Sequence, residues 1–441
     1  MLNTIELKAG AASTTITPRE SHFLFGYPFV ERRSSGTHDD LLSSALYLSD
    51  GKNRVLFVSN DVIYISKAST ARIRKGISDR TGIRTSNILI AATHTHSAPV
   101  TVDLVISAND PVIPKVDKNY LRFMEENSVK AACQAVENAT LAEIAIVVGD
   151  ATGVGTNRHN PEWIKDTDVP ALFVKSKNGN EFIGCMVVCN MHPTVLHEDS
   201  TLYSGDFPHY ARKKLQDAVL GKNRPVIYFT GAAGNQSPRH VTNANTFGEA
   251  KRLGQIVADS LTAKLTDTET FFSRTHVLAV QKFINLPKRV FPPVEWATGH
   301  RDETKKRFEE LKQYSKNSRE IRTAEVNWFG SEELLYLSKL SRDKALEKAY
   351  QSSLPAEIQI IKVGDWKFVA WSGEVFVEYG IELKSQAEKV ALITYANGEL
   401  QGYIVTKEAE ERGYYEAGNA FFGYQAGHIM LAETLKVLKW M

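Results

Sequence analysis

The first prediction about the fold comes from residues 87–96, which read Asn-Ile-Leu-Ile-Ala-Ala-Thr-His-Thr-His. The run up to Ala92 is apolar enough for a strand that is buried on both faces. Residues 54–60 form another such run, and residues 67–81 between them carry apolar side chains at helical spacing. This order of strand, helix and strand predicts a parallel pair with a right-handed crossover. Both histidines then lie just past the carboxyl end of a strand, where open α/β sheets build their sites.

The same alternation continues along the chain. It predicts helices at 120–139 and 207–220 and strands at 144–148, 171–175, 182–189 and 225–230. Residues 357–371 are typical of a β-hairpin that turns at Gly364-Asp365, with a helix opening at 372–374. A charged helical segment, about 293–352, reads as an exposed insertion. We therefore expect one large α/β catalytic domain over 1–441, with a mixed, largely parallel central sheet flanked by helices and a helical insertion.

Composition argues against several classes of protein. The formal charge is only +2 and the basic residues are scattered among acidic ones, so we expect no nucleic-acid partner. Three cysteines, Cys133, Cys185 and Cys189, are too few for a disulfide framework and indicate buried core thiols. We find neither an apolar run long enough for a transmembrane segment nor a secretion signal, and we expect a cytoplasmic protein. The oligomeric state is left open.

Histidines and a glutamate at the ends of predicted strands are candidate metal ligands. His94 and His96 follow one strand, His192 and His197 another, and Glu374 a third. Catalytic zinc binds neutral imidazoles and a carboxylate and keeps one position open for water. Two side chains that lie two residues apart share a face only in a regular extended turn. We therefore expect one of His94 and His96 to reach the metal and the other to serve acid-base chemistry or substrate contact.

Ser237 lies in a loop of small residues, Gly231-Ala-Ala-Gly-Asn-Gln-Ser237-Pro, that follows a buried strand. Such a loop lets backbone approach a ligand closely. It lacks the G-x-S-x-G elbow, and its own segment contains no histidine that an aspartate could orient. The sequence leaves open whether Ser237 is a nucleophile or positions the substrate.

Ten short motifs, spread from about residue 8 to about residue 425, occur in the order in which neutral ceramidases carry similar motifs, and the chain resembles that family. The motifs are Ala9–Pro18, Phe25-Gly-Tyr27, Val58–Asp61, Thr93–Pro99, Asn157-Arg158, His192-Pro-Thr194, Ser204-Gly-Asp206, Gly234–Pro238, Gly373-Glu374 and Tyr415-Glu416. The resemblance is weakest through the helical insertion.

The resemblance assigns roles to individual residues. It implies zinc held by His94, His192, Glu374 and Tyr415, with Tyr414 as the alternative tyrosine. It implies that Ser237 is a catalytic residue and that Arg158 lies beside the substrate carbonyl. His96 is then free to handle protons for the leaving group.

Departures from the family pattern bear on the substrate. The family's glycines are replaced by Val100, Thr101 and Val102, and its Gly-Asp-x-Ser reads Gly-Asn-Gln-Ser here. The chain stops soon after Tyr415, so we expect the family's C-terminal immunoglobulin-like domain to be absent. These observations predict a zinc-dependent hydrolase that cleaves an amide by metal-activated water, on a small-molecule or lipid-like substrate smaller or more polar than ceramide. An esterase or lactonase with the same zinc site, or a non-catalytic metal-containing binding module, are the alternatives.

Overall fold

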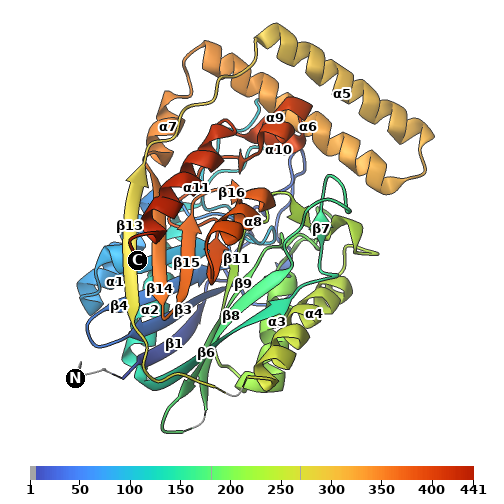
Figure 1. The fold of residues 1–441 in the computed structure, drawn as a ribbon. Helices are drawn as coiled ribbons and strands as arrows, with labels where there is room; N and C mark the ends of the chain where they lie inside the picture. The colour runs from blue at the N-terminus through green and yellow to red at the C-terminus, as the bar shows by residue number, and fades with distance from the viewer. Residues whose placement is uncertain (1–5, 180, 269) are drawn as a thin grey trace.

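The structure is a computed structural model that describes residues 6–179, 181–268 and 270–441. Residues 1–5, part of the N-terminal segment behind the localisation prediction, lie outside the described residues. Within those ranges no helix is both long and apolar enough to cross a bilayer. The mixed α/β class is confirmed (Figure 1).

One eight-stranded sheet forms the centre of the molecule, and it is mostly antiparallel. Its strands, in spatial order, are β11 (Val226–Thr230), β9 (Phe182–Cys189), β8 (Asp168–Ser176), β6 (Thr140–Asp150), β1 (Lys8–Thr15), β3 (Leu42–Ser49), β4 (Arg54–Asn60) and β5 (Ile88–Ala92). Only β9–β11 and β4–β5 pair in parallel, while the other five pairs are antiparallel. The largely parallel sheet was therefore a wrong prediction. Strands without an intervening helix, such as β3 and β4, turn back on each other, which gives antiparallel pairs.

A second, four-stranded sheet packs on the first. It contains β13 (Val277–Ile284), β14 (Ala356–Val363), β15 (Trp366–Trp371) and β17 (Val390–Ile393). The predicted hairpin is confirmed as β14 and β15. Along β15, Phe368 joins the core between the two sheets, whereas Val369 and Trp371 face the opposite side. This alternation follows from the two-residue period of a strand and gives the sheet two apolar faces.

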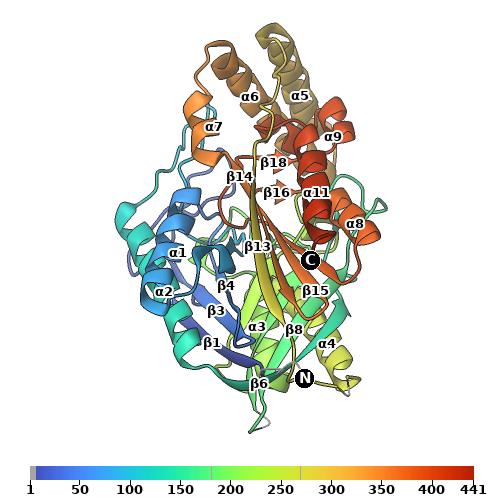
Figure 2. The same cartoon turned by 60° about the vertical axis from the view of Figure 1, so that its left-hand side comes forward.

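Helices cover both outer faces (Figures 1 and 2). The larger sheet is covered by α1 (Lys67–Thr81) and α2 (Lys118–Glu137) over one half and by α3 (Phe207–Leu215) and α4 (Phe247–Thr266) over the other. The smaller sheet is covered by α8 (Val377–Gln386) and α11 (Gln425–Leu438). Helix α1 has the predicted bounds, with Ser66 as its N-cap and Gly82 in the left-handed conformation as its C-cap.

The predicted helical insertion consists of α5 (Val294–Tyr314), α6 (Ser318–Arg342) and α7 (Glu347–Ser353). Helices α5 and α6 lie side by side at the end of the molecule that also carries α9 (Lys407–Arg412) and α10 (Tyr415–Asn419) (Figures 1 and 2). The insertion is not simply exposed, because α6 buries Phe329, Leu334 and Leu337. The division of the chain into one catalytic domain over 1–441 with an insertion at about 293–352 stays a prediction.

The two edges of the large sheet meet at one end. Strands β11 and β5 are the edge strands, yet the hydroxyl of Thr230, the last residue of β11, donates to the carbonyl of Thr93 after β5, at 2.7 Å. The segment after β17 joins them, because Thr394 N donates to Thr230 O at 2.9 Å and Ala92 N donates to Tyr395 O at 3.1 Å. The sheet therefore curls so that loops from distant strands share one site.

Candidate metal centre and active site

Three histidines meet where β5 and β9 end. The Nε2 atom of His94 lies 3.1 Å from Nε2 of His192 and 3.2 Å from Nε2 of His96. His94 and His192 are each 1% exposed. One nitrogen from each ring lies within 4.8 Å of the others, which is a suitable donor set for a metal ion.

The hydrogen-bond partners of the Nδ1 atoms of His94 and His192 fix which nitrogen of each ring faces the cluster. His94 Nδ1 lies 2.9 Å from the carbonyl of Ile63, and His192 Nδ1 lies 2.5 Å from that of Ala233. A carbonyl only accepts, so each Nδ1 carries a proton and each Nε2 is the atom that faces the cluster. A metal ion there would bind both rings in their neutral form, and ligating histidines commonly have such carbonyl partners. The residues present therefore fit a metal ion.

Glu374 supplies a carboxylate to the same cluster. Its Oε2 atom lies 3.2 Å from His192 Nε2 and 3.5 Å from His94 Nε2. Burial alone would raise the pKa of Glu374, but His94 and His192 hold it well below its usual range, so the group is an anion. Glu374 lies in the short strand β16 (Glu374–Val375), and the helix predicted to open there begins only at Val377.

His96 joins the cluster differently. Its Nδ1 is buried and has no hydrogen-bond partner among the described residues, and its ring packs against Tyr27. The sequence predicted that one histidine of the turn reaches the metal position, yet the Nε2 atoms of both face it. The reason is the backbone at His94, where φ is 66°, so the turn is bent rather than extended. Burial, and then His94, lowers the pKa of His96 well below its usual range, so its ring is neutral.

Ser237 and Arg158 line a pocket that adjoins the cluster. Strand β12 (Gln236–Ser237) pairs with β7 (Thr156–Asn157), which places Ser237 near Arg158. Ser237 is 4% exposed and its hydroxyl has no partner within the described ranges. Arg158 donates from Nε to Glu416 at 2.5 Å, while its Nη2 is buried and equally unpartnered. Buried polar atoms without partners are rare, and two beside a cluster of imidazoles indicate a ligand position.

The two candidate tyrosines have different surroundings. Tyr415, the first residue of α10, lines the pockets on both sides of His96. Tyr414 instead packs its ring on His159, with 4.1 Å between the ring centroids. These positions favour Tyr415 over Tyr414 as the residue that faces the metal position. His197 lines the second pocket and lies outside the histidine cluster.

Three further tyrosines lie at the site and were not predicted from the sequence. The Tyr64 hydroxyl donates to Glu374 Oε1, and the Tyr395 ring stacks on His94 with centroids 4.0 Å apart. Tyr403, paired with Glu374 across β16 and β18 (Tyr403–Ile404), lies under the Arg158 guanidinium. Tyr64 follows β4 closely, and that strand-end position was its only signal in the sequence.

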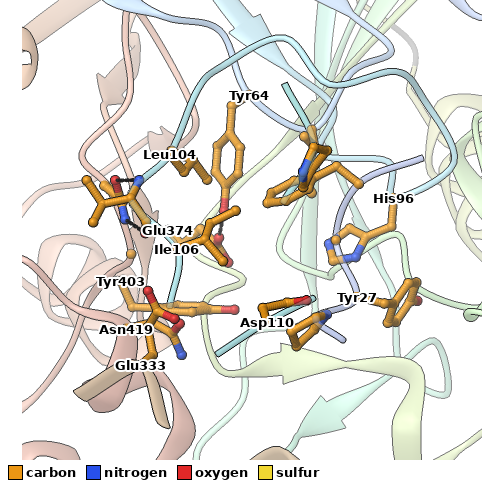
Figure 3. Close-up of a pocket in the computed structure, with 18 of the residues that line it drawn as sticks. Tyr27, Tyr64, His96, Leu104, Ile106, Asp110, Glu333, Glu374, Tyr403 and Asn419 are labelled. Atoms are coloured by element: carbon orange, nitrogen blue, oxygen red, sulfur yellow. Dashed lines mark hydrogen bonds between the residues drawn. The ribbon is translucent and has the colours of Figure 1, made fainter. Parts of the chain in front are cut away.

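Figure 3 shows the larger pocket, with Tyr403, Asn419 and Glu333 lying across it from His96 and Tyr27. Its wall contains Leu104, Val105 and Ile106. Val100 and Val102, on which the prediction of a smaller or more polar substrate partly rests, are themselves buried in the protein.

Comparison with known proteins agrees with this architecture. Residues 7–258 match the family described as neutral/alkaline non-lysosomal ceramidase, N-terminal. The fold is similar to that of neutral ceramidase from Pseudomonas aeruginosa, with a TM-score of 0.75 at 16% identity, over 98% of this chain and 74% of that one. A ceramidase complexed with C2 has the same TM-score at 15% identity, over 97% of this chain and 74% of that one. The family match over residues 7–258 covers more than half of this chain, and the chain therefore belongs to the neutral/alkaline non-lysosomal ceramidase family.

Proposed function

We propose that this chain is a zinc-dependent hydrolase that cleaves the amide bond of an N-acyl substrate. The observation that supports this most directly is the convergence of three buried imidazoles and the Glu374 carboxylate beside a pocket with unpartnered polar atoms. Family membership supports hydrolysis and a lipid-like substrate. His94, His192, Glu374 and Tyr415 would hold the ion.

A zinc ion there would polarise the scissile carbonyl and lower the pKa of a water molecule that it binds. The chain's own residues would do the rest. Arg158 Nη2 and Ser237 Oγ are free to donate to the oxyanion of a tetrahedral intermediate, which is the largest contribution in many acyl-transfer sites. His96, buried and neutral beside the cluster, would accept the proton that the attacking water gives up and pass it to the leaving amine.

The first test is metal content together with hydrolysis of an N-acyl panel. We expect about one zinc per chain, strong depletion in His192→Ala and no change in His276→Ala. His276 is a matched control because its side chain is 84% exposed and is not part of the histidine cluster. Removal of the metal should abolish amide hydrolysis, and added zinc should restore it.

The panel also separates the alternatives. We expect short or polar N-acyl amides to be cleaved faster than long-chain ceramide. Turnover of esters and lactones alone would favour the esterase or lactonase hypothesis, because the groups of this site would stabilise the same oxyanion in an ester as in an amide. A full zinc content with no turnover on any member would favour a metal-containing binding module.

A further inference from the structure

Two pockets of opposite character meet at His96. The larger one, here called the apolar arm, has Phe23, Phe25, Leu104, Ile106, Val112 and Pro114 in its wall. The smaller one, here called the basic arm, contains Thr194, His197, Ser237 and three arginines, Arg158, Arg239 and Arg322. Gly26, Tyr27, His96, Tyr403 and Tyr415 line both arms, so the arms join at the proposed centre of reaction.

The charges of the two arms differ in sign. The carboxyl groups that line the pockets, Asp110, Glu333 and Glu374, all lie in the apolar arm, and Glu333 among them is neutral below pH 8 because burial raises its pKa to about 8. The basic arm contains no carboxylate in its lining. An anionic group on a ligand would therefore be repelled from the first arm and attracted to the second.

Of the three arginines, Arg239 is the one for which the described residues provide no ion-pair partner. Arg158 is paired with Glu416 at 2.5 Å, and Arg322 is paired with Glu325 at 2.7 Å and with Glu198 at 3.1 Å. Among the described residues, Arg239 takes part in no ion pair and no hydrogen bond. Burial, and then the neighbouring Arg158, lowers the pKa of Arg239 to about 10, with Glu416 opposing them, so at neutral pH Arg239 is a charged guanidinium without an ion-pair partner of its own.

A partly buried guanidinium without an ion-pair partner is unfavourable unless a ligand supplies the opposite charge. The basic arm also holds the unpartnered Ser237 hydroxyl and the unpartnered Nη2 of Arg158, both buried. These two donors, assigned above to the oxyanion, share one pocket with Arg239, so a group bound to Arg239 lies next to the scissile amide. A planar guanidinium matches a carboxylate in a bidentate pair, and Arg239 therefore gives the arm the donor and the charge of a carboxylate subsite.

We propose that the amine half of the substrate carries a carboxylate that binds Arg239, so that the substrate is an N-acyl amino acid with its acyl chain in the apolar arm. This inference rests on the proposed amide hydrolysis. In that reaction the C–N bond breaks, the oxygen of one water joins the acyl carbon, and the amine leaves with a proton. The products are a fatty acid and a free amino acid.

The test compares N-lauroylglycine with N-lauroylglycinamide, which differ by one charge at nearly equal size. Release of lauric acid by the zinc-loaded enzyme gives kcat/KM for each. We expect preference for the anionic substrate, and Arg239→Gln should lower its kcat/KM by about 10- to 100-fold, the range of a hydrogen bond to a charged group. The value for the neutral amide should change less than about twofold. Arg239→Lys should retain part of the preference, and Arg319→Gln, an exposed arginine on α6, should retain all of it.

Equal rates for the two substrates, or an unchanged preference in Arg239→Gln, would overturn the carboxylate subsite while leaving amide hydrolysis intact. A separate measurement covers failure of the hydrolysis itself. Calorimetric titration of the metal-depleted protein should show tighter binding of N-lauroylglycine than of N-lauroylglycinamide, and Arg239→Gln should remove the difference. That result without turnover would retain the subsite and refute the proposed function.

Discussion

The Nε2 atoms of His94 and His96 lie 3.2 Å apart although a single residue separates the two in the chain. The positive φ of His94 bends the turn and aims both rings at one point. The two histidines differ, however, in the hydrogen-bond partner of Nδ1, the ring nitrogen that faces away from this point. Nδ1 of His94 is held by the carbonyl of Ile63, whereas Nδ1 of His96 has no partner among the described residues.

This difference predicts different roles for the two histidines. Ligating histidines are usually oriented by a hydrogen bond at the other nitrogen, so His94→Ala and His192→Ala should lose most of the bound zinc. His96→Ala should keep the metal and lose turnover, by about 10²- to 10⁴-fold for loss of a proton donor. Elemental analysis of purified variants, alongside kcat, measures both.

The same measurements can contradict this division. Wild-type zinc in both His94→Ala and His192→Ala would remove them as ligands. Zinc lost from His96→Ala would make His96 a ligand, and a different group would then have to protonate the amine. His276→Ala controls for the loss of any histidine, since its side chain is exposed.

Gly26 offers a way to displace His96 without removing it. A Cβ at Gly26 would lie 2.2 Å from His96 Nδ1, and the φ of +121° there is unfavourable for any other residue. Gly26→Ala should therefore push the ring out of place and lower kcat by about 10²-fold, the scale of a 1 Å misplacement, with zinc retained. Gly299→Ala is the matched control, because a Cβ at that position meets nothing within 4 Å. Normal kcat in Gly26→Ala would argue against His96 as the proton donor.

The sequence predicted the elements better than their arrangement. The bounds of α1 and β4 and the parallel pairing of β4 with β5 are as predicted, because continuous apolar runs mark the two strands and a left-handed Gly82 ends the helix between them. The antiparallel pairings and the meeting of β5 with β11 were missed, since they depend on the curl of the whole sheet.

The residues of the site likewise divide into those that the sequence predicted and those that it did not. His94, His192 and Glu374 were candidates because they follow predicted strands, the family resemblance then assigned them as ligands, and the structure brings them together. Tyr64 and Tyr395 were missed because a tyrosine after a strand is an ordinary core residue until its neighbours are known. Arg239 carried no motif at all, and only its unpaired position in the basic arm distinguishes it.

Glu333 predicts a pH dependence for the apolar arm. Burial, and to a lesser extent Asp110, raises the pKa of Glu333 to about 8, although the backbone amide of Ser107 donates to it at 2.9 Å. Below pH 8 the carboxyl is protonated and neutral, and above pH 8 a negative charge appears beside the acyl chain. KM for long-acyl amides should therefore rise about three- to tenfold between pH 7 and 9, or roughly 1 kcal/mol of binding.

Glu333→Gln should flatten this rise, because a glutamine stays neutral throughout. Glu309 is an exposed residue of α5, and Glu309→Gln should leave the rise of KM with pH unchanged. Steady-state kinetics at each pH measures the effect, and an identical pH profile of KM in wild type and Glu333→Gln would show that this carboxyl does not titrate in the arm.

The last prediction concerns the role of Ser237. A serine nucleophile needs a base within hydrogen-bond reach, yet the Ser237 hydroxyl contacts no partner in the described ranges, and Nδ1 of His192 is occupied by the carbonyl of Ala233. A donor aimed at the oxyanion needs no base. Ser237→Ala should therefore lower kcat by about 10²- to 10³-fold, the scale for one oxyanion donor, with unchanged zinc content. No acyl-enzyme should form in the wild type. An acyl group found on Ser237 by mass spectrometry, or a burst of leaving group equal to the enzyme concentration, would instead establish the covalent route.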